Sequence, residues 1–179
     1  MPTQFAGSKK RQNSSATKKA ARCLQNPFRY MEIKQKVNLN AELKRQLQAH
    51  VYDVVGVIQN VHKELPQGMP EYLYQEALTI ALDQAGMNPQ KEYQHHPSFR
   101  GIPLKSFLKM DIVVPKQRGN IIIECKALEK LTSKEYQQLF SYMLGTEFPI
   151  GILVNFHSYP KITLHKFYYD RTDKTITSF

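Results

Sequence analysis

The 179-residue sequence lacks any apolar run near the roughly 20 residues that a membrane-spanning helix needs, so no membrane segment is expected. Its first residues also lack the apolar stretch of a secretory signal peptide. Only two cysteines are present, Cys23 and Cys125, which are too few for a disulfide framework and suit a reducing compartment. No CxxC pair or closely spaced pair of histidines is available for structural zinc. These absences favour a cytoplasmic protein without disulfides.

Acidic residues are absent from the first 30 positions, although basic residues are frequent there. The basic residues are Lys9, Lys10, Arg11, Lys18, Lys19, Arg22 and Arg29. Since the whole chain carries 25 basic and 15 acidic residues and a net charge of +10, most of that charge comes from this segment. We predict a basic, disordered tail over residues 1–30 and a single domain over residues 31–179.

The role of the predicted tail is open on sequence grounds. It is either a solvated extension or a segment that attracts polyanions such as nucleic acid. In a eukaryotic source, an acid-free start rich in serine and lysine also fits an organelle transit peptide. Its clusters of basic residues would then equally fit a nuclear signal.

Hydrophobic periodicity predicts an α/β fold with a central mixed sheet flanked by helices. The expected helices cover residues 40–65, with Asn40 as N-cap, residues 70–85, and residues 133–145 behind a capping box of Thr132 and Glu135. The expected strands cover residues 93–99, 104–114, 121–126 and 150–155, with 162–169 and 175–178 as edge strands. The strand–helix–strand step from 121 to 155 predicts a parallel crossover.

Two charged side chains interrupt an otherwise apolar strand, which reads Ile-Ile-Ile-Glu-Cys-Lys over residues 121–126. Glu124 and Lys126 are two residues apart and therefore share one face of the strand. Asp111 lies on the preceding strand, and a hairpin with an uneven turn would bring it beside Glu124. Two adjacent carboxylates repel each other unless a cation lies between them, and Mg²⁺ prefers such oxygen ligands. The alternative is an ion pair between Glu124 and Lys126 on a solvent-facing strand.

Several motifs in this order resemble the GxxExxY family, a branch of the PD-(D/E)XK nuclease superfamily. They are GMPEYLY at 68–74, GIPL at 101–104, DIVV at 111–114, IIECKA at 122–127, QLFSYM at 138–143 and GILVNF at 151–156. The resemblance covers roughly residues 48–169. It implies a restriction-endonuclease-like core and a nuclease that depends on Mg²⁺ or Mn²⁺.

The resemblance also assigns roles to individual residues. Asp111 and Glu124 match the metal-binding acids, and Glu71 matches a helical glutamate that can join them. Lys126 matches the motif lysine, which could hold or deprotonate the attacking water or offset developing charge. Gln138 matches a glutamine that lines the site.

Two tyrosines are expected to support this site. Tyr74 matches the signature tyrosine and is expected to be a core aromatic that positions Glu71. Tyr142 lies four residues after Gln138, on the same helix face.

The sequence leaves more than one function open. As a nuclease, the protein would contact the nucleic-acid backbone through its tail and through Lys105, Lys109, Lys116 and Arg118. The alternatives are a catalytically inactive module on the same fold that binds nucleic acid or protein, and a role in a larger complex. DNA and RNA are both open as substrates, and so are a monomer and a homodimer.

Overall fold

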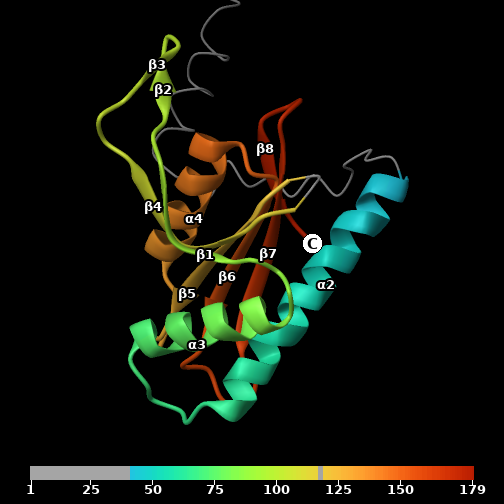
Figure 1. Cartoon of the computed structure of the whole chain (residues 1–179), viewed down its shortest axis with the longest axis vertical. Coiled ribbons are helices and arrows are strands. Elements are labelled where there is room, and N and C mark those ends of the chain that lie inside the picture. The colour runs from blue at the N-terminus through green and yellow to red at the C-terminus, as the bar shows by residue number, and fades with distance from the viewer. Residues whose placement is uncertain (1–40, 117–118) are drawn as a thin grey trace, which may run out of the picture. The chain divides into compact units, whose positions relative to one another are not determined.

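The computed structural model describes residues 41–116 and 119–179, which form an α/β domain with a mixed sheet (Figure 1). Three predicted features lie outside these residues: the tail over residues 1–30, the cap at Asn40 and the nucleic-acid contact at Arg118. In the described parts, the helices are α2 (Ala41–Glu64), α3 (Glu71–Gln84) and α4 (Ser133–Thr146). No helix in these parts is both long and apolar enough to span a bilayer.

Six strands form the central sheet, in the order β1-β4-β5-β6-β7-β8. They are β1 (Gln90–His95), β4 (Leu108–Val114), β5 (Ile121–Lys126), β6 (Ile150–Asn155), β7 (Thr163–Asp170) and β8 (Thr175–Ser178). Neighbours run antiparallel except β5 and β6, which are parallel and joined through α4. The predicted mixed sheet and its single parallel crossover are therefore confirmed.

The two faces of β5 meet different helices. Ile121, Ile123 and Cys125 belong to the main hydrophobic core, which includes the buried side chains of α2 and α3. Since side chains alternate along a strand, Glu124 and Lys126 point to the opposite face. That face is covered by α4, and this arrangement places two charged groups between a helix and the middle of the sheet.

The start of α4 follows the predicted capping box. Thr132 Oγ1 accepts a hydrogen bond from the Lys134 amide at 3.3 Å, and the Glu135 carboxylate accepts one from the Thr132 amide at 2.7 Å. Two of the amides that a helix start leaves unpaired are thus satisfied by side chains. The confirmed cap fixes where α4 begins, and hence where Gln138 lies along the sheet.

The strands predicted at 93–99 and 104–114 were wrong in their boundaries. β1 begins earlier, at Gln90, and residues 104–107 are not a strand. Between β1 and β4 lies a separate small hairpin of β2 (Ser98–Phe99) and β3 (Ile102–Pro103). Pro97 and Pro103 cannot donate to a strand ladder, which separates the hairpin from the longer strands. Arg100 and Gly101 form its two-residue turn, with φ of 52° and 79°.

We expect a methyl group at Gly151 to loosen the contact between α4 and β6. A Cβ added there would lie 2.5 Å from Met143 Sδ and 3.1 Å from a Leu139 methyl, and both side chains are fully buried. Gly151→Ala should therefore lower the free energy of unfolding by roughly 1–3 kcal/mol, measured by urea denaturation.

Gly56→Ala is the matched control, because an added Cβ at that position in α2 meets nothing within 4 Å. It should raise the free energy of unfolding by about 0.5–1 kcal/mol through helix propensity. Equal effects of the two substitutions would contradict the close packing at Gly151.

Candidate active site

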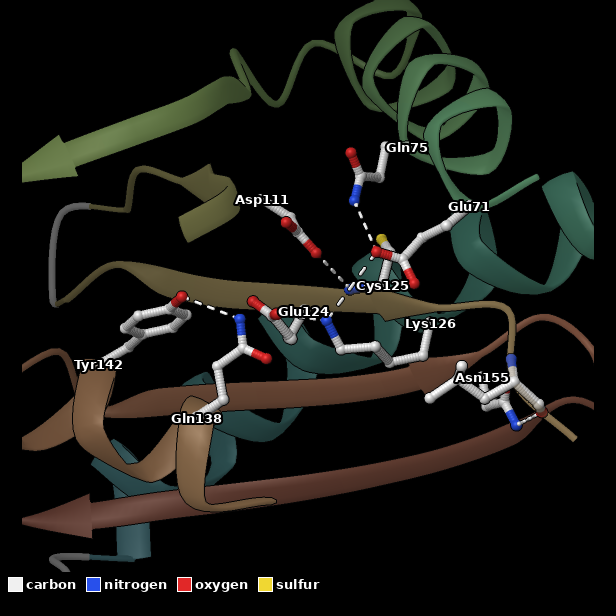
Figure 2. Close-up of polar contacts among 10 residues, drawn as sticks. Glu71, Gln75, Asp111, Glu124, Cys125, Lys126, Gln138, Tyr142 and Asn155 are labelled. Atoms are coloured by element: carbon white, nitrogen blue, oxygen red, sulfur yellow. Dashed lines mark hydrogen bonds and ion pairs between the residues drawn. The ribbon is translucent and has the colours of Figure 1, made fainter. Parts of the chain in front are cut away.

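Four ionisable side chains from three elements meet near the end of β5 (Figure 2). Glu124 and Lys126 come from β5, Asp111 from β4 and Glu71 from the first turn of α3. In Figure 2, Glu71 and Asp111 point toward the strand segment that carries Glu124 and Lys126. The residues predicted to form the site from separate parts of the sequence thus lie together.

Asp111 is held at the point where β4 and β5 separate. The ladder between the two strands pairs Ile112 with Ile123, and its next position would place Asp111 opposite Glu124. At that position Asp111 Oδ2 instead accepts a hydrogen bond from the Cys125 amide at 2.9 Å. Burial raises the pKa of Asp111 above its ordinary value, although the Cys125 hydrogen bond and the Lys126 charge act against it. A carboxylate therefore takes the place of a backbone acceptor beside Glu124.

Glu124 is the most deeply buried of these groups, with no exposed side-chain surface. Its Oε1 accepts a hydrogen bond from Lys126 Nζ at 2.7 Å, whereas its Oε2 has no hydrogen-bond partner among the described residues. Burial, followed by the charge of Asp111, raises the pKa of Glu124 from 4.5 to about 7. A buried carboxylate oxygen without a donor is costly, so this atom needs a proton or a cation.

Lys126 links two of the acids. Its Nζ lies 2.7 Å from Glu124 Oε1 and 3.9 Å from Glu71 Oε1. Burial alone would lower the pKa of Lys126, but the charge and hydrogen bond of Glu124, with Glu71 and Asp111, raise it above its ordinary value. The amine is therefore charged at neutral pH. The alternative of an ion pair on a solvent-facing strand is wrong in one respect, because only 11% of the Lys126 side chain is exposed.

Glu71 lies at the edge of this cluster, with 35% of its side chain exposed. Burial raises its pKa, and the charge of Lys126 opposes that rise. Over residues 41–116 and 119–179, no three histidine, cysteine, aspartate or glutamate side chains converge as a ready-made metal cage. The donor set instead fits an ion such as Mg²⁺, which takes one or two protein carboxylates and keeps several waters. Asp111 and the free oxygen of Glu124 are the groups best suited to that role.

Gln138 and Tyr142 line the side of the site formed by α4 (Figure 2). Gln138 Nε2 donates a hydrogen bond to the Tyr142 hydroxyl at 2.9 Å. Burial raises the pKa of Tyr142, and the charges of Glu124 and Asp111 add to the rise, so the phenol lies within range of both acids. The neutral phenol and the amide can therefore act as hydrogen-bonding groups beside the acids.

Tyr74 lies in the core, at a distance from the polar groups. Its side chain is 1% exposed and stacks on Phe156, with ring centroids 4.6 Å apart. Its hydroxyl donates a hydrogen bond to the Pro66 carbonyl at 3.0 Å, in the loop that leads to α3. These contacts fix the start of α3 and with it Glu71, in keeping with a positioning role.

The lysines predicted to contact nucleic acid are spread along the sheet. Lys105 is exposed in the segment between β3 and β4, and Lys109 pairs with Glu92 at 3.0 Å. Lys116 lies two residues beyond Val114, the last residue of β4, which is roughly 10 Å along the strand from Asp111. Lys105 and Lys109 therefore lie on the side of Asp111 where β4 begins, and Lys116 lies on the opposite side.

Two polar residues that the sequence motifs did not indicate contact the site or its supports. Gln75 Nε2 donates to Glu71 Oε1 at 3.4 Å, and its position four residues after Glu71 was the available signal. Asn155 pairs with Lys126 across the parallel strands and is 2% exposed. Its side chain bonds both the amide and the carbonyl of Leu128, at 3.0 and 2.6 Å, which fixes the chain where it leaves β5.

We expect the metal-free protein to lose stability as the pH rises from about 5 to about 8. The folded state binds the Glu124 proton more tightly than the unfolded state, because its pKa is raised from 4.5 to about 7. This contribution is fully present below pH 4.5 and is lost as the pH rises through 7. It amounts to something on the order of 2–3 kcal/mol. Urea unfolding in EDTA at several pH values measures it.

Glu124→Gln is the control for this titration. The amide keeps the shape of the side chain but cannot ionise, so most of the decline between pH 5 and 8 should disappear relative to wild type. Parallel pH curves for the two proteins would show that Glu124 titrates near its ordinary value.

The sequence was compared with known protein families, curated proteins and solved structures. A family model described as the PD-(D/E)XK nuclease superfamily matches residues 48–167. No curated protein matches the chain significantly.

Two solved structures are similar over part of the chain. The crystal structure of SSO0001 shares 20% identity and a TM-score of 0.41, over 53% of this chain and 48% of its own length, so the similarity spans about half of that protein. Hjc, a Holliday junction resolvase from the archaeal hyperthermophile Archaeoglobus fulgidus, shares 20% identity and a TM-score of 0.36, over 59% of this chain and 84% of its own. These scores are too low to support a functional argument.

Proposed function

Because the chain belongs to the PD-(D/E)XK nuclease superfamily, we propose that it is a metal-dependent nuclease that hydrolyses phosphodiester bonds in DNA or RNA. One observation carries the proposal: a fully buried glutamate, Glu124, has a carboxylate oxygen without a donor among the described residues, next to a second, partly buried acid, Asp111. A structural role alone gives no reason to keep these acids side by side. Burial and then the charge of Asp111 raise the pKa of Glu124, and a divalent cation between the two acids would offset that charge.

We further infer that the chain lies in the GxxExxY branch of the superfamily. The support is the sequence GMPEYLY at residues 68–74, in which Glu71 reaches the site and Tyr74 anchors the same helix turn. The cytoplasmic location expected from the sequence stays a prediction.

Asp111 and Glu124 are the residues that would hold a magnesium or manganese ion, with Glu71 as a more distant third acid. When bound, such an ion polarises the phosphodiester and lowers the pKa of a water molecule. Buried oxygen donors of this kind suit a hard divalent cation. We propose magnesium or manganese as that cation.

The remaining polar groups act on substrate and water. Charged Lys126 would orient the attacking water and offset negative charge that grows on the phosphoryl oxygens. Its raised pKa favours this role over that of a base in the metal-free protein. The Gln138 amide and the Tyr142 hydroxyl, bonded to each other, would orient groups on the side of α4. Holding the reacting groups in place is itself a large part of catalysis in phosphodiester hydrolysis.

The test is a cleavage assay with the full chain on mixed DNA and RNA, single- and double-stranded, with Mg²⁺, with Mn²⁺ and with EDTA. Cleavage that requires the ion and disappears in EDTA supports the proposal. Binding that survives EDTA, with no product under any metal condition, would instead support the inactive module on the same fold.

A further inference from the structure

The β2–β3 hairpin presents an unusual concentration of exposed apolar side chains. Phe99 is 63% exposed, Ile102 70%, Leu104 44% and Phe107 47%. Phe99 and Ile102 lie opposite each other in the hairpin. Single exposed apolar residues are ordinary, but clustered ones mark a surface that binds something.

The charge around these residues has one sign. No acidic residue occurs between Glu92 and Asp111, whereas Arg100, Lys105 and Lys109 fall within that segment. Lys109 is already paired with Glu92, which leaves Arg100 and Lys105 as the exposed cations of the hairpin region. An apolar surface in a segment whose exposed charges are both positive fits a polyanion that also offers flat apolar groups.

The hairpin is a fixed support for these side chains. The Leu104 amide donates to the Pro97 carbonyl at 2.8 Å, and the Leu104 carbonyl lies 3.0 Å from a ring nitrogen of His96. The His96 ring also contacts Phe107 edge-on, at 5.6 Å between centroids. At the tip, the Arg100 guanidinium lies over the Phe99 ring, 5.2 Å from its centroid. Aromatic and guanidinium planes are thus presented together.

The position of the hairpin relates it to the candidate active site. It projects from the sheet where β1 ends and β4 begins (Figure 1). Leu108, the first residue of β4, is three residues before Asp111. Because β4 and β5 are antiparallel, the start of β4 lies at the same end of the sheet as Lys126, the last residue of β5. A nucleic-acid strand that reaches the acids from this side would pass the hairpin.

We propose that the β2–β3 hairpin binds unpaired bases of the substrate, with Phe99 stacked on a base and Arg100 and Lys105 on the flanking phosphates. This inference rests on the proposed nuclease function and narrows it to nucleic acid with a single-stranded segment. Stacking on an aromatic ring tolerates any base, and guanidinium groups stack and pair with phosphate in the same way. A fully paired duplex hides its base faces and offers only phosphates to this surface.

The experiment measures binding separately from cleavage. Fluorescence anisotropy of full-length Asp111→Asn protein is recorded with a labelled single strand and with the blunt duplex of the same sequence. Phe99→Ala in that background should weaken single-strand binding roughly tenfold, the usual effect of losing one base–aromatic stack, and change duplex binding little. Phe99→Leu should lose nearly as much, because it keeps apolar area but not the ring. A 2-aminopurine base in the strand should be quenched by the Asp111→Asn parent and not by either variant.

Tyr52→Ala is the matched control, because Tyr52 is an aromatic side chain on α2 that is 79% exposed. Its single-strand affinity should equal that of the parent. Thermal unfolding of each variant checks that the fold is retained.

Three results would overturn the proposal. One is a Phe99→Ala variant that binds single strands as tightly as the parent, and another is an equal loss for single strand and duplex. The third is a dimer that forms as the protein concentration rises and that Ile102→Ser dissociates without a change in strand binding. That result would make the hairpin an interface between two copies of the chain. Phe99-dependent strand binding without any metal-dependent cleavage would uphold the hairpin and overturn the nuclease. Metal-dependent cleavage that is unchanged by Phe99→Ala would uphold the nuclease and overturn the role of the hairpin.

Discussion

Asp111→Asn is expected to lower kcat/KM for phosphodiester cleavage by roughly 10³-fold, which corresponds to the several kcal/mol that a bound cation supplies to the transition state. The substitution removes one of the two carboxylates that would hold the ion. It should also reduce binding of Mg²⁺ or Mn²⁺, measured by calorimetric titration. Loss of cleavage and loss of metal binding in the same variant would tie the two together.

The stability of this variant distinguishes a chemical effect from a structural one. Asparagine retains an oxygen that can accept the hydrogen bond of the Cys125 amide, now 2.9 Å from Asp111 Oδ2. Removing the charge also relieves the repulsion that raises the pKa of Glu124. The melting temperature of Asp111→Asn should therefore equal or exceed that of wild type in EDTA.

Asp111→Ala is the informative companion. It leaves the Cys125 amide without an acceptor at a site where the neighbouring thiol is fully buried, which costs roughly 1–3 kcal/mol. Both variants should cleave far more slowly than wild type, but only Asp111→Ala should unfold at lower urea. An Asp111→Asn protein that cleaves at the wild-type rate would contradict the proposed metal site.

Lys126→Met is expected to lower kcat by roughly 10²–10⁴-fold, the range found when a group acting on a proton or on developing charge is removed. Its amine lies 2.7 Å from Glu124 and is charged at neutral pH, so the substitution removes a fixed positive charge from the site. Rates are measured across pH with saturating metal. If the amine acts through its charge, the pH–rate profile of the variant keeps its shape and lies lower.

The same variant tests the role of the buried pair in stability. Removing Lys126 leaves Glu124 buried without its partner, which is more costly than replacing both members. The double variant Glu124→Gln/Lys126→Met should therefore be more stable than Lys126→Met alone at pH 8. In the kinetic test, loss of the rising limb of the pH–rate profile in Lys126→Met would identify Lys126 as a base and contradict a role through charge alone.

The local structure of this protein was largely predictable from its sequence. The apolar run at residues 121–126, the capping box of Thr132 and Glu135 and the apolar strand at 150–155 led to β5, α4 and β6 with their parallel pairing. Such features depend on neighbours along the chain, for which spacing is a reliable guide. The prediction for the region between β1 and β4 was wrong, because prolines there interrupt a pattern that otherwise alternates like that of one long strand.

The candidate site was predictable in residue type and only partly in arrangement. The spacing of Glu124 and Lys126 placed both on one face of a strand, and the motifs pointed to Asp111, Glu71 and Gln138. The sequence did not indicate that Asp111 bonds the amide of Cys125, or that Gln138 bonds Tyr142 and not an acid. The contact of Asp111 depends on where β4 leaves β5, and the contact of Gln138 lies within one face of α4.

By itself, the sequence determined which elements form, which face of each strand is apolar and which residue types are available for metal chemistry, since these follow from periodicity and side-chain chemistry. Only the tertiary structure decided that Glu124 is fully buried, that one of its oxygens has no donor in the described part of the chain, and that an exposed aromatic hairpin projects from the end of the sheet. The physical reason is that burial and unpaired atoms arise from the packing of separate elements against one another, and spacing along a chain does not fix those distances.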